Sequence, residues 1–118
     1  MKLPGPDHPI AIAPAQGRVV VRFGEVVVAD TMKALELREA SYPPVLYIPR
    51  ADAKLAHFVR TDHRTYCPYK GDASYFSLAA NGTEAKDAVW SYETPYPAMA
   101  EIKEHVAFYP RHVTIARE

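Results

Sequence analysis

The sequence has no excess of either charge and no long apolar run. Fourteen basic and fourteen acidic side chains cancel to a net charge of zero. A chain without surplus charge creates no long-range field to attract nucleic acid, so we expect no nucleic-acid partner. No stretch approaches the roughly 18 apolar residues of a membrane span, so we expect no membrane partner either.

Cysteine is almost absent, since Cys67 is the only one, and no internal disulfide can form. The first ten residues contain no apolar run of signal-peptide length. Together these two features predict a reducing, cytoplasmic location. The sequence identifies no cofactor and leaves the oligomeric state open.

Eleven prolines and eight tyrosines are the most prominent features of the composition. Prolines disfavour a helical bundle because each removes a backbone donor and fixes φ. Tyrosines favour strands and half-buried surfaces. The Pro- and Gly-rich residues 1–17 are predicted to be an extended arm, and residues 18–118 a single mostly-β domain.

Two β-hairpins are predicted from turn chemistry. Residues 18–30 contain two β-branched runs around Gly24-Glu25, and residues 73–92 fold back at Asn81-Gly82, a pair suited to a type I′ turn. With a regular two-residue loop, Leu78 faces Ala85, Tyr75 faces Ala88 and Ala73 faces Trp90. This register places Tyr75 and Trp90 close together on one face.

The remaining segments are predicted mainly as strands. We prefer strand to helix for 33–40, and we expect strands at 45–48, 106–110 and 112–118. Residues 50–58 and 94–106 favour short helices, whereas 57–71 is predicted to be irregular and basic. About eight strands give a mostly-β fold, either a small barrel or two folded antiparallel sheets with one or two short helices.

The segment TYCPYKGDASYF, residues 65–76, combines the cysteine with a lysine and several aromatic rings. His63, Arg64 and Lys70 supply positive charge that would favour a reactive Cys67 thiolate. We prefer the simpler interpretation, in which Cys67 is a small buried apolar residue. His105 is a candidate proton carrier if it lines a cavity, and is otherwise a half-buried, hydrogen-bonded histidine.

Other chemistries are less well supported by this segment. It lacks the glycines that a phosphate-binding loop places before its lysine. Asp72 and Asp87 are candidate carboxylates for Mg²⁺-dependent nucleotidyl transfer, but nothing in their spacing shows that they meet. His57, His63 and Cys67 have irregular spacing for zinc, so we predict no metal site.

The abundance of phenols near a lysine and the single tryptophan predicts a polar-aromatic pocket. Its candidate ligand-binding residues are Lys70, Tyr75, Trp90, Tyr92, Tyr47 and Arg64, and its candidate catalytic residues are Cys67, Lys70 and His105.

Several segments occur in a characteristic order: RVVVRF…VVVADT, YPPVLYIP, TYCPYKGDASYF, VWSYETPYP and HVAFYP. In this order the sequence resembles the domain-of-unknown-function 427 family from about residue 18 to residue 110. CPYKGDASY is the most specific block of the resemblance, and the C-terminal RHVTIARE departs from many relatives. The resemblance implies a compact mostly-β domain and no established activity, although a nucleotidyltransferase label is sometimes attached to the family.

Three functions therefore compete. The first is a small-molecule-binding domain, with or without catalysis. The second is a non-catalytic module that docks a protein through a strand edge or an aromatic patch. The third is nucleotidyltransferase-like activity. A concavity containing Lys70 and Trp90 would favour the first, a flat aromatic surface the second, and a pair of adjacent carboxylates the third.

Overall fold

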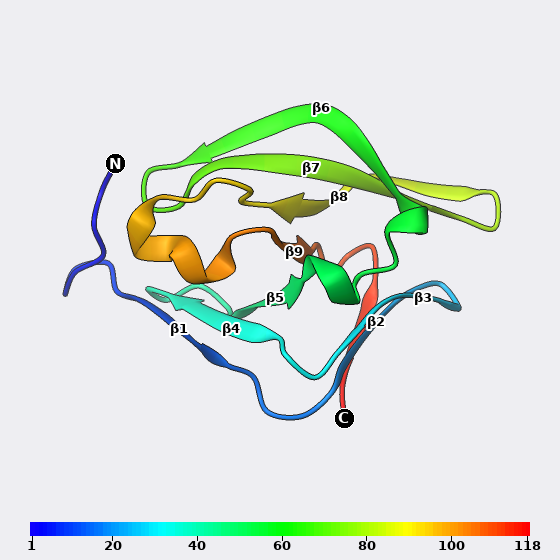
Figure 1. Ribbon diagram of the computed structural model, residues 1–118, viewed down its shortest axis with the longest axis horizontal. Coiled ribbons are helices and arrows are strands. Elements are labelled where there is room, and N and C mark those ends of the chain that lie inside the picture. Colours follow the sequence, from blue (N-terminus) through cyan, green and yellow to red (C-terminus); the bar gives the residue numbers. More distant parts are fainter.

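Ten strands form two antiparallel sheets in the computed structural model, which describes residues 1–118. The larger sheet has seven strands in the order β1-β4-β5-β9-β8-β7-β6, and the smaller has three in the order β10-β2-β3 (Figure 1). The strands are β1 (Ile10–Pro14), β2 (Val19–Phe23), β3 (Val26–Thr31), β4 (Leu35–Glu39), β5 (Val45–Pro49), β6 (Phe58–Cys67), β7 (Gly71–Ala80), β8 (Thr83–Ser91), β9 (His105–Phe108) and β10 (Thr114–Arg117). Of the two predicted architectures, the folded sheets are confirmed and the closed barrel is wrong.

Both predicted hairpins are present. β2 and β3 are paired as far as Phe23 and Val26, on either side of the turn Gly24-Glu25. Gly24 has a φ of +61° in this turn. β7 and β8 pair up to the turn at Asn81-Gly82, whose φ values are +52° and +75°. Positive φ at both positions is the requirement of a type I′ turn, so this turn is confirmed.

The register of the β7–β8 hairpin differs from the predicted one beyond its first pairs. Leu78 faces Ala85 as predicted, but Tyr75 faces Trp90 rather than Ala88. The register shifts between Phe76 and Leu78, where β8 contains two more residues than β7. Because the bulge adds two residues, the side chains of β8 beyond it point to the same faces of the sheet as they would without it. Tyr75 and Trp90 are therefore neighbours, as predicted, but through a different register.

Residues on the two faces of the large sheet belong to two separate cores. Along β9, Val106 and Phe108 join the first core and Ala107 joins the second. The first core fills the space between the large and the small sheet, with valines of β2 and β3 among its members. The second core contains Tyr47, Tyr75, Tyr92 and, from a turn described below, Met99 and Ile102. This second face carries most of the aromatic side chains that the sequence marks as site residues.

The second face is concave because the large sheet bends at its middle. The short strand β9 joins the two halves, with only two residue pairs to β5 and two to β8. Figure 1 shows β6, β7 and β8 on one side of the molecule and β1 and β4 on the other. Side chains from both halves consequently point toward one another.

The helical predictions are realised only as 3₁₀ turns. Residues 50–58 form two turns, η1 (Arg50–Asp52) and η2 (Leu55–His57), and the later segment forms η3 (Pro97–Ile102). Met99 breaks the helical geometry of η3 with φ −112° and ψ 21°. Runs of 3₁₀ geometry are usually this short because their hydrogen bonds are poorly aligned. No helix has the length and apolar character needed to cross a membrane.

Two segments contain strands that the sequence did not indicate. The predicted arm, residues 1–17, includes β1, which pairs with β4 at the edge of the large sheet. The predicted irregular segment contains β6, the opposite edge strand. Arg60, Asp62, His63 and Arg64 are exposed on β6 and hide its strand pattern. Charged side chains are characteristic of edge strands, which must avoid pairing with other chains.

Candidate functional site

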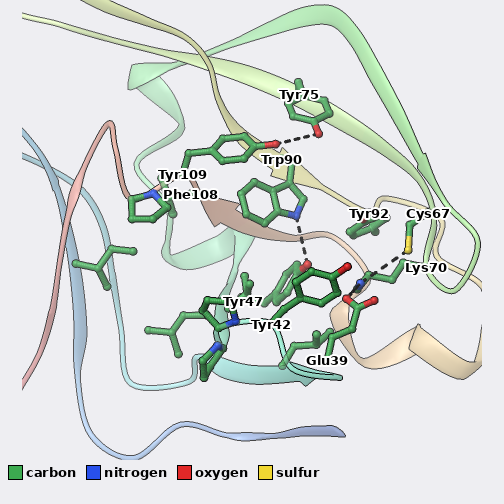
Figure 2. A pocket seen from close by; sticks show the side chains of 17 residues that line it. Glu39, Tyr42, Tyr47, Cys67, Lys70, Tyr75, Trp90, Tyr92, Phe108 and Tyr109 are labelled. Carbon is green, nitrogen blue, oxygen red and sulfur yellow. Dashed lines mark hydrogen bonds and ion pairs between the residues drawn. The ribbon is translucent and has the colours of Figure 1, made fainter. Parts of the chain in front are cut away.

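The concave face of the large sheet contains a cavity of about 660 Å³. Seventeen residues line it and twelve of them are hydrophobic (Figure 2). They come from the seven strands β4 to β10 and from the segments that follow β4, β6, β8 and β9. The side chain of Tyr42 is at its exposed rim, since this residue is 65% accessible to solvent. The aromatic members of the lining are Tyr42, Tyr47, Tyr75, Trp90, Tyr92, Phe108 and Tyr109.

Trp90 lies in the middle of these aromatic side chains (Figure 2). Its indole N–H donates a hydrogen bond of 3.2 Å to the hydroxyl of Tyr47, whose ring meets it edge-on at 6.3 Å. The ring of Tyr109 is 4.6 Å from the indole. Tyr47 is nearly inaccessible to solvent, and burial raises its pKa above the ordinary value. The indole is therefore held in place by a neutral phenol.

A second group of hydroxyls lies on the other side of Trp90. The hydroxyl of Tyr75 is 3.2 Å from that of Tyr109 and 2.9 Å from that of Thr65. Burial and the hydrogen bond with Tyr75 raise the pKa of Tyr109 to about 12. Burial also raises the pKa of Tyr92. Tyr109 and Tyr92 therefore remain protonated at neutral pH and can act as hydrogen-bond donors.

The third side of the cavity is polar. Lys70 is 5% exposed and forms an ion pair with Glu39, and its Nζ is 3.8 Å from Cys67 Sγ (Figure 2). His8 Nε2 is 2.7 Å from the other oxygen of Glu39, and the His8 ring stacks on Tyr69 at 4.2 Å. Burial would raise the pKa of Glu39, but the hydrogen bonds from Lys70 and His8 outweigh it and hold the pKa below its usual range.

Local structure explains why Lys70 points into this cavity. Lys70 belongs to the turn between β6 and β7, where Cys67 faces Gly71. Gly71 has a φ of +106°, which only glycine adopts without strain. The carbonyl of Lys70 accepts a hydrogen bond of 3.0 Å from the N–H of Tyr96. These constraints fix the backbone on both sides of the lysine.

The structure brings together most of the residues that the sequence proposed for the site. Those that line the cavity are Cys67, Lys70, Tyr75, Trp90, Tyr92 and Tyr47. Arg64 does not line it, because Thr65 points toward Tyr75 and the preceding residue of a strand points to the opposite face. His105 does not line it either, and its Nδ1 is 3.0 Å from the carbonyl of Lys103.

Two important members of the polar side were missed. Glu39 ends a strand of alternating charges, and His8 lies in the segment predicted to be an arm. A buried lysine requires a carboxylate, which is a usable signal, but the sequence offers fourteen acidic residues. Glu39 is 31 positions from Lys70, so no local pattern connects them.

The candidate metal ligands do not converge. No group of three or more His, Cys, Asp and Glu side chains lies close enough to hold a metal ion. The backbone N–H of Asp87 donates to the Ser77 hydroxyl, five residues along β7 from Asp72. At about 3.3 Å per residue, the two aspartates are attached roughly 16 Å apart. The paired carboxylates that nucleotidyl transfer would need are not formed by these residues.

Fold and cavity together define a small all-β domain with an aromatic cavity closed on one side by a buried lysine–glutamate pair. A family model described as a domain of unknown function (DUF427) matches residues 11–118. The chain belongs to this family, as the order of its segments predicted. The match includes β10 and all of β1 except Ile10, and so extends beyond the predicted limits at both ends. No curated protein matches the chain.

Proposed function

We propose that this protein binds a small molecule through an uncharged, planar aromatic or heteroaromatic ring in the cavity around Trp90. The observation that supports the proposal is a cavity of about 660 Å³ with aromatic side chains from both halves of the sheet. Ligand pockets are commonly about 300–1,000 Å³ in volume and mainly apolar, with a few polar groups that orient the ligand. Rings stack favourably on tryptophan and tyrosine.

The charges at the polar side favour a neutral ring. Lys70 is the only basic residue in the lining, and Glu39 neutralises it. An ammonium group has three N–H donors. Glu39 and Cys67 occupy two of them, which leaves one for an acceptor atom on the ligand. A ring that carries a carbonyl oxygen or ring nitrogen would satisfy this donor.

The competing functions have less support. The aromatic side chains gather in a concavity, whereas a docking module would present them on a flat surface. The separation of Asp72 and Asp87 gives nucleotidyl transfer no carboxylate pair. Any catalysis would involve the polar side of the cavity, where Lys70 and Cys67 meet. We propose a cytoplasmic location because Cys67 is unpaired.

The proposal can be tested with Trp90 itself, because it is the only tryptophan. A panel of metabolites and nucleotides is screened by thermal shift, and hits are titrated by tryptophan fluorescence. A ligand at a hundredfold excess over its Kd should raise the Tm by about 10 °C and change the fluorescence.

Two variants separate the cavity from the rest of the surface. Tyr92→Leu should weaken binding because Tyr92 lines the cavity. Tyr66→Leu is the matched control, since Tyr66 is 56% exposed and lies outside the cavity. Equal loss of binding in both variants, or a panel without a single hit, would contradict the proposal.

A further inference from the structure

A second cavity of about 430 Å³ adjoins the aromatic one. Its lining consists of His63, Tyr75, Lys86, Asp87, Tyr109 and Arg111. Tyr75 and Tyr109 also line the first cavity, so the two spaces meet at these two phenols. Figure 2 shows their hydroxyl groups directed toward each other. The second cavity differs from the first because charged side chains dominate its lining.

The charge in this second cavity is unbalanced and positive. His63, Lys86 and Arg111 take part in none of the ion pairs of the protein. The one acidic residue, Asp87, accepts a hydrogen bond of 2.6 Å from the Thr61 hydroxyl. Basic side chains that share a cavity and lack carboxylate partners attract anions. An arginine among them adds the planar donor group that fits carboxylate and phosphate oxygens.

The basic side chains lie within reach of a ligand in the aromatic cavity. The Arg111 guanidinium is 5.0 Å from the centre of the Tyr109 ring, and the Trp90 ring is 4.6 Å from that same ring. Arg111 and Trp90 are therefore no farther apart than the sum of these two distances. His63 similarly lies against the other shared phenol, Tyr75, at 4.4 Å. A ring with a short substituent can span this separation.

We propose that the second cavity binds an anionic group, a phosphate or a carboxylate, carried on a short substituent of the ring that occupies the first cavity. This inference rests on the proposed function and adds the chemical class of the ligand. The ring lies against Trp90, and the substituent passes Tyr109 to Arg111 and Lys86. The neutral Lys70–Glu39 pair and the basic cavity thus act on different parts of one molecule.

Isothermal titration calorimetry with matched probes tests this inference. 1-Naphthol supplies the neutral ring, 1-naphthyl phosphate and 1-naphthylacetate add the two kinds of anion, and inorganic phosphate supplies the anion alone. At least one anionic probe should bind about tenfold or more tightly than 1-naphthol, as expected for one charge-assisted contact. Which of the two binds more tightly distinguishes phosphate from carboxylate.

Variants assign the gain to the second cavity. Arg111→Gln and Lys86→Gln should reduce binding of the anionic probe toward that of 1-naphthol and leave 1-naphthol unchanged. Lys33→Gln is the control, because Lys33 is exposed and lines neither cavity. Equal affinity for neutral and anionic probes would overturn this inference while the proposed function stands. Failure of every ring-bearing probe would count against both, and binding of inorganic phosphate without any ring-bearing probe would overturn the link between the two cavities.

Discussion

Replacing Lys70 with methionine should destabilise the protein, because it leaves Glu39 charged and partly buried. Breaking a fully buried ion pair by removing one partner costs about 3–5 kcal/mol. The Glu39 side chain keeps 18% of its exposure and retains its contact with His8, so we expect a smaller loss of about 2 kcal/mol. Methionine has a similar volume, and little of the loss should come from packing.

The change of this stability loss with pH tests whether the ion pair is its cause. In the wild type, the pKa of Glu39 is lowered on folding. Its stabilisation is complete above the unfolded pKa of about 4.3 and is lost as the pH falls through the folded value. Without Lys70, burial dominates and raises the pKa of Glu39 on folding. The deficit of the variant should therefore be larger at pH 7 than at pH 4.5.

Urea denaturation at the two pH values measures both effects. Combining Lys70→Met with Glu39→Gln should recover most of the lost stability, because no uncompensated charge remains. Lys33→Met is the control and should change the unfolding free energy by no more than about 0.5 kcal/mol, as is usual for exposed sites. A Lys70→Met loss below that size, or one of equal size at both pH values, would refute the role of the ion pair.

Three further outcomes are expected. Gly82→Val should cost about 1 kcal/mol or more in urea denaturation, because φ is +75° there, and unchanged stability would argue against the tight turn. In an absorbance titration at 295 nm, Tyr109 with its pKa of about 12 should ionise late, as should Tyr47. A phenol whose pKa is raised on folding stabilises the protein only while it is protonated, so the free energy of unfolding should fall above pH 10. Ionisation of all eight tyrosines near pH 10 would contradict this prediction. Iodoacetamide should label Cys67 slowly in the folded protein at pH 7, and fast labelling that Lys70→Met abolishes would restore a reactive cysteine.

The sequence predicted those parts of the fold that depend on neighbouring residues. Asn81-Gly82 determines its turn through two positive φ values, whatever the rest of the chain does. The β-branched runs on either side of Gly24-Glu25 likewise identified the strands of the first hairpin. β6 was not predicted as a strand. An edge strand pairs with a neighbour on one side only, and the exposed charges of β6 mask the pattern that would identify it.

The site was predictable in composition but not in its charge arrangement. Tyr75, Trp90 and Lys70 were expected together because one hairpin and the turn before it carry them. Glu39 reaches Lys70 only when the sheet bends, which no local pattern encodes. The basic cavity was missed for the same reason, since His63, Lys86 and Arg111 come from three distant segments.

The bulge in β8 determines which residue of β7 faces Trp90. Asp87 adopts a φ of +52° there, and its backbone N–H is bound by the Ser77 hydroxyl. If the two extra residues of β8 were instead paired regularly with β7, every inward and outward direction would be preserved, but Trp90 would face Ala73. The indole would move about 7 Å along β7, away from Tyr75. Loss of the bulge by re-pairing, with the sequence and all lining residue types unchanged, would thus dismantle the cavity, so the bulge itself determines where the indole lies.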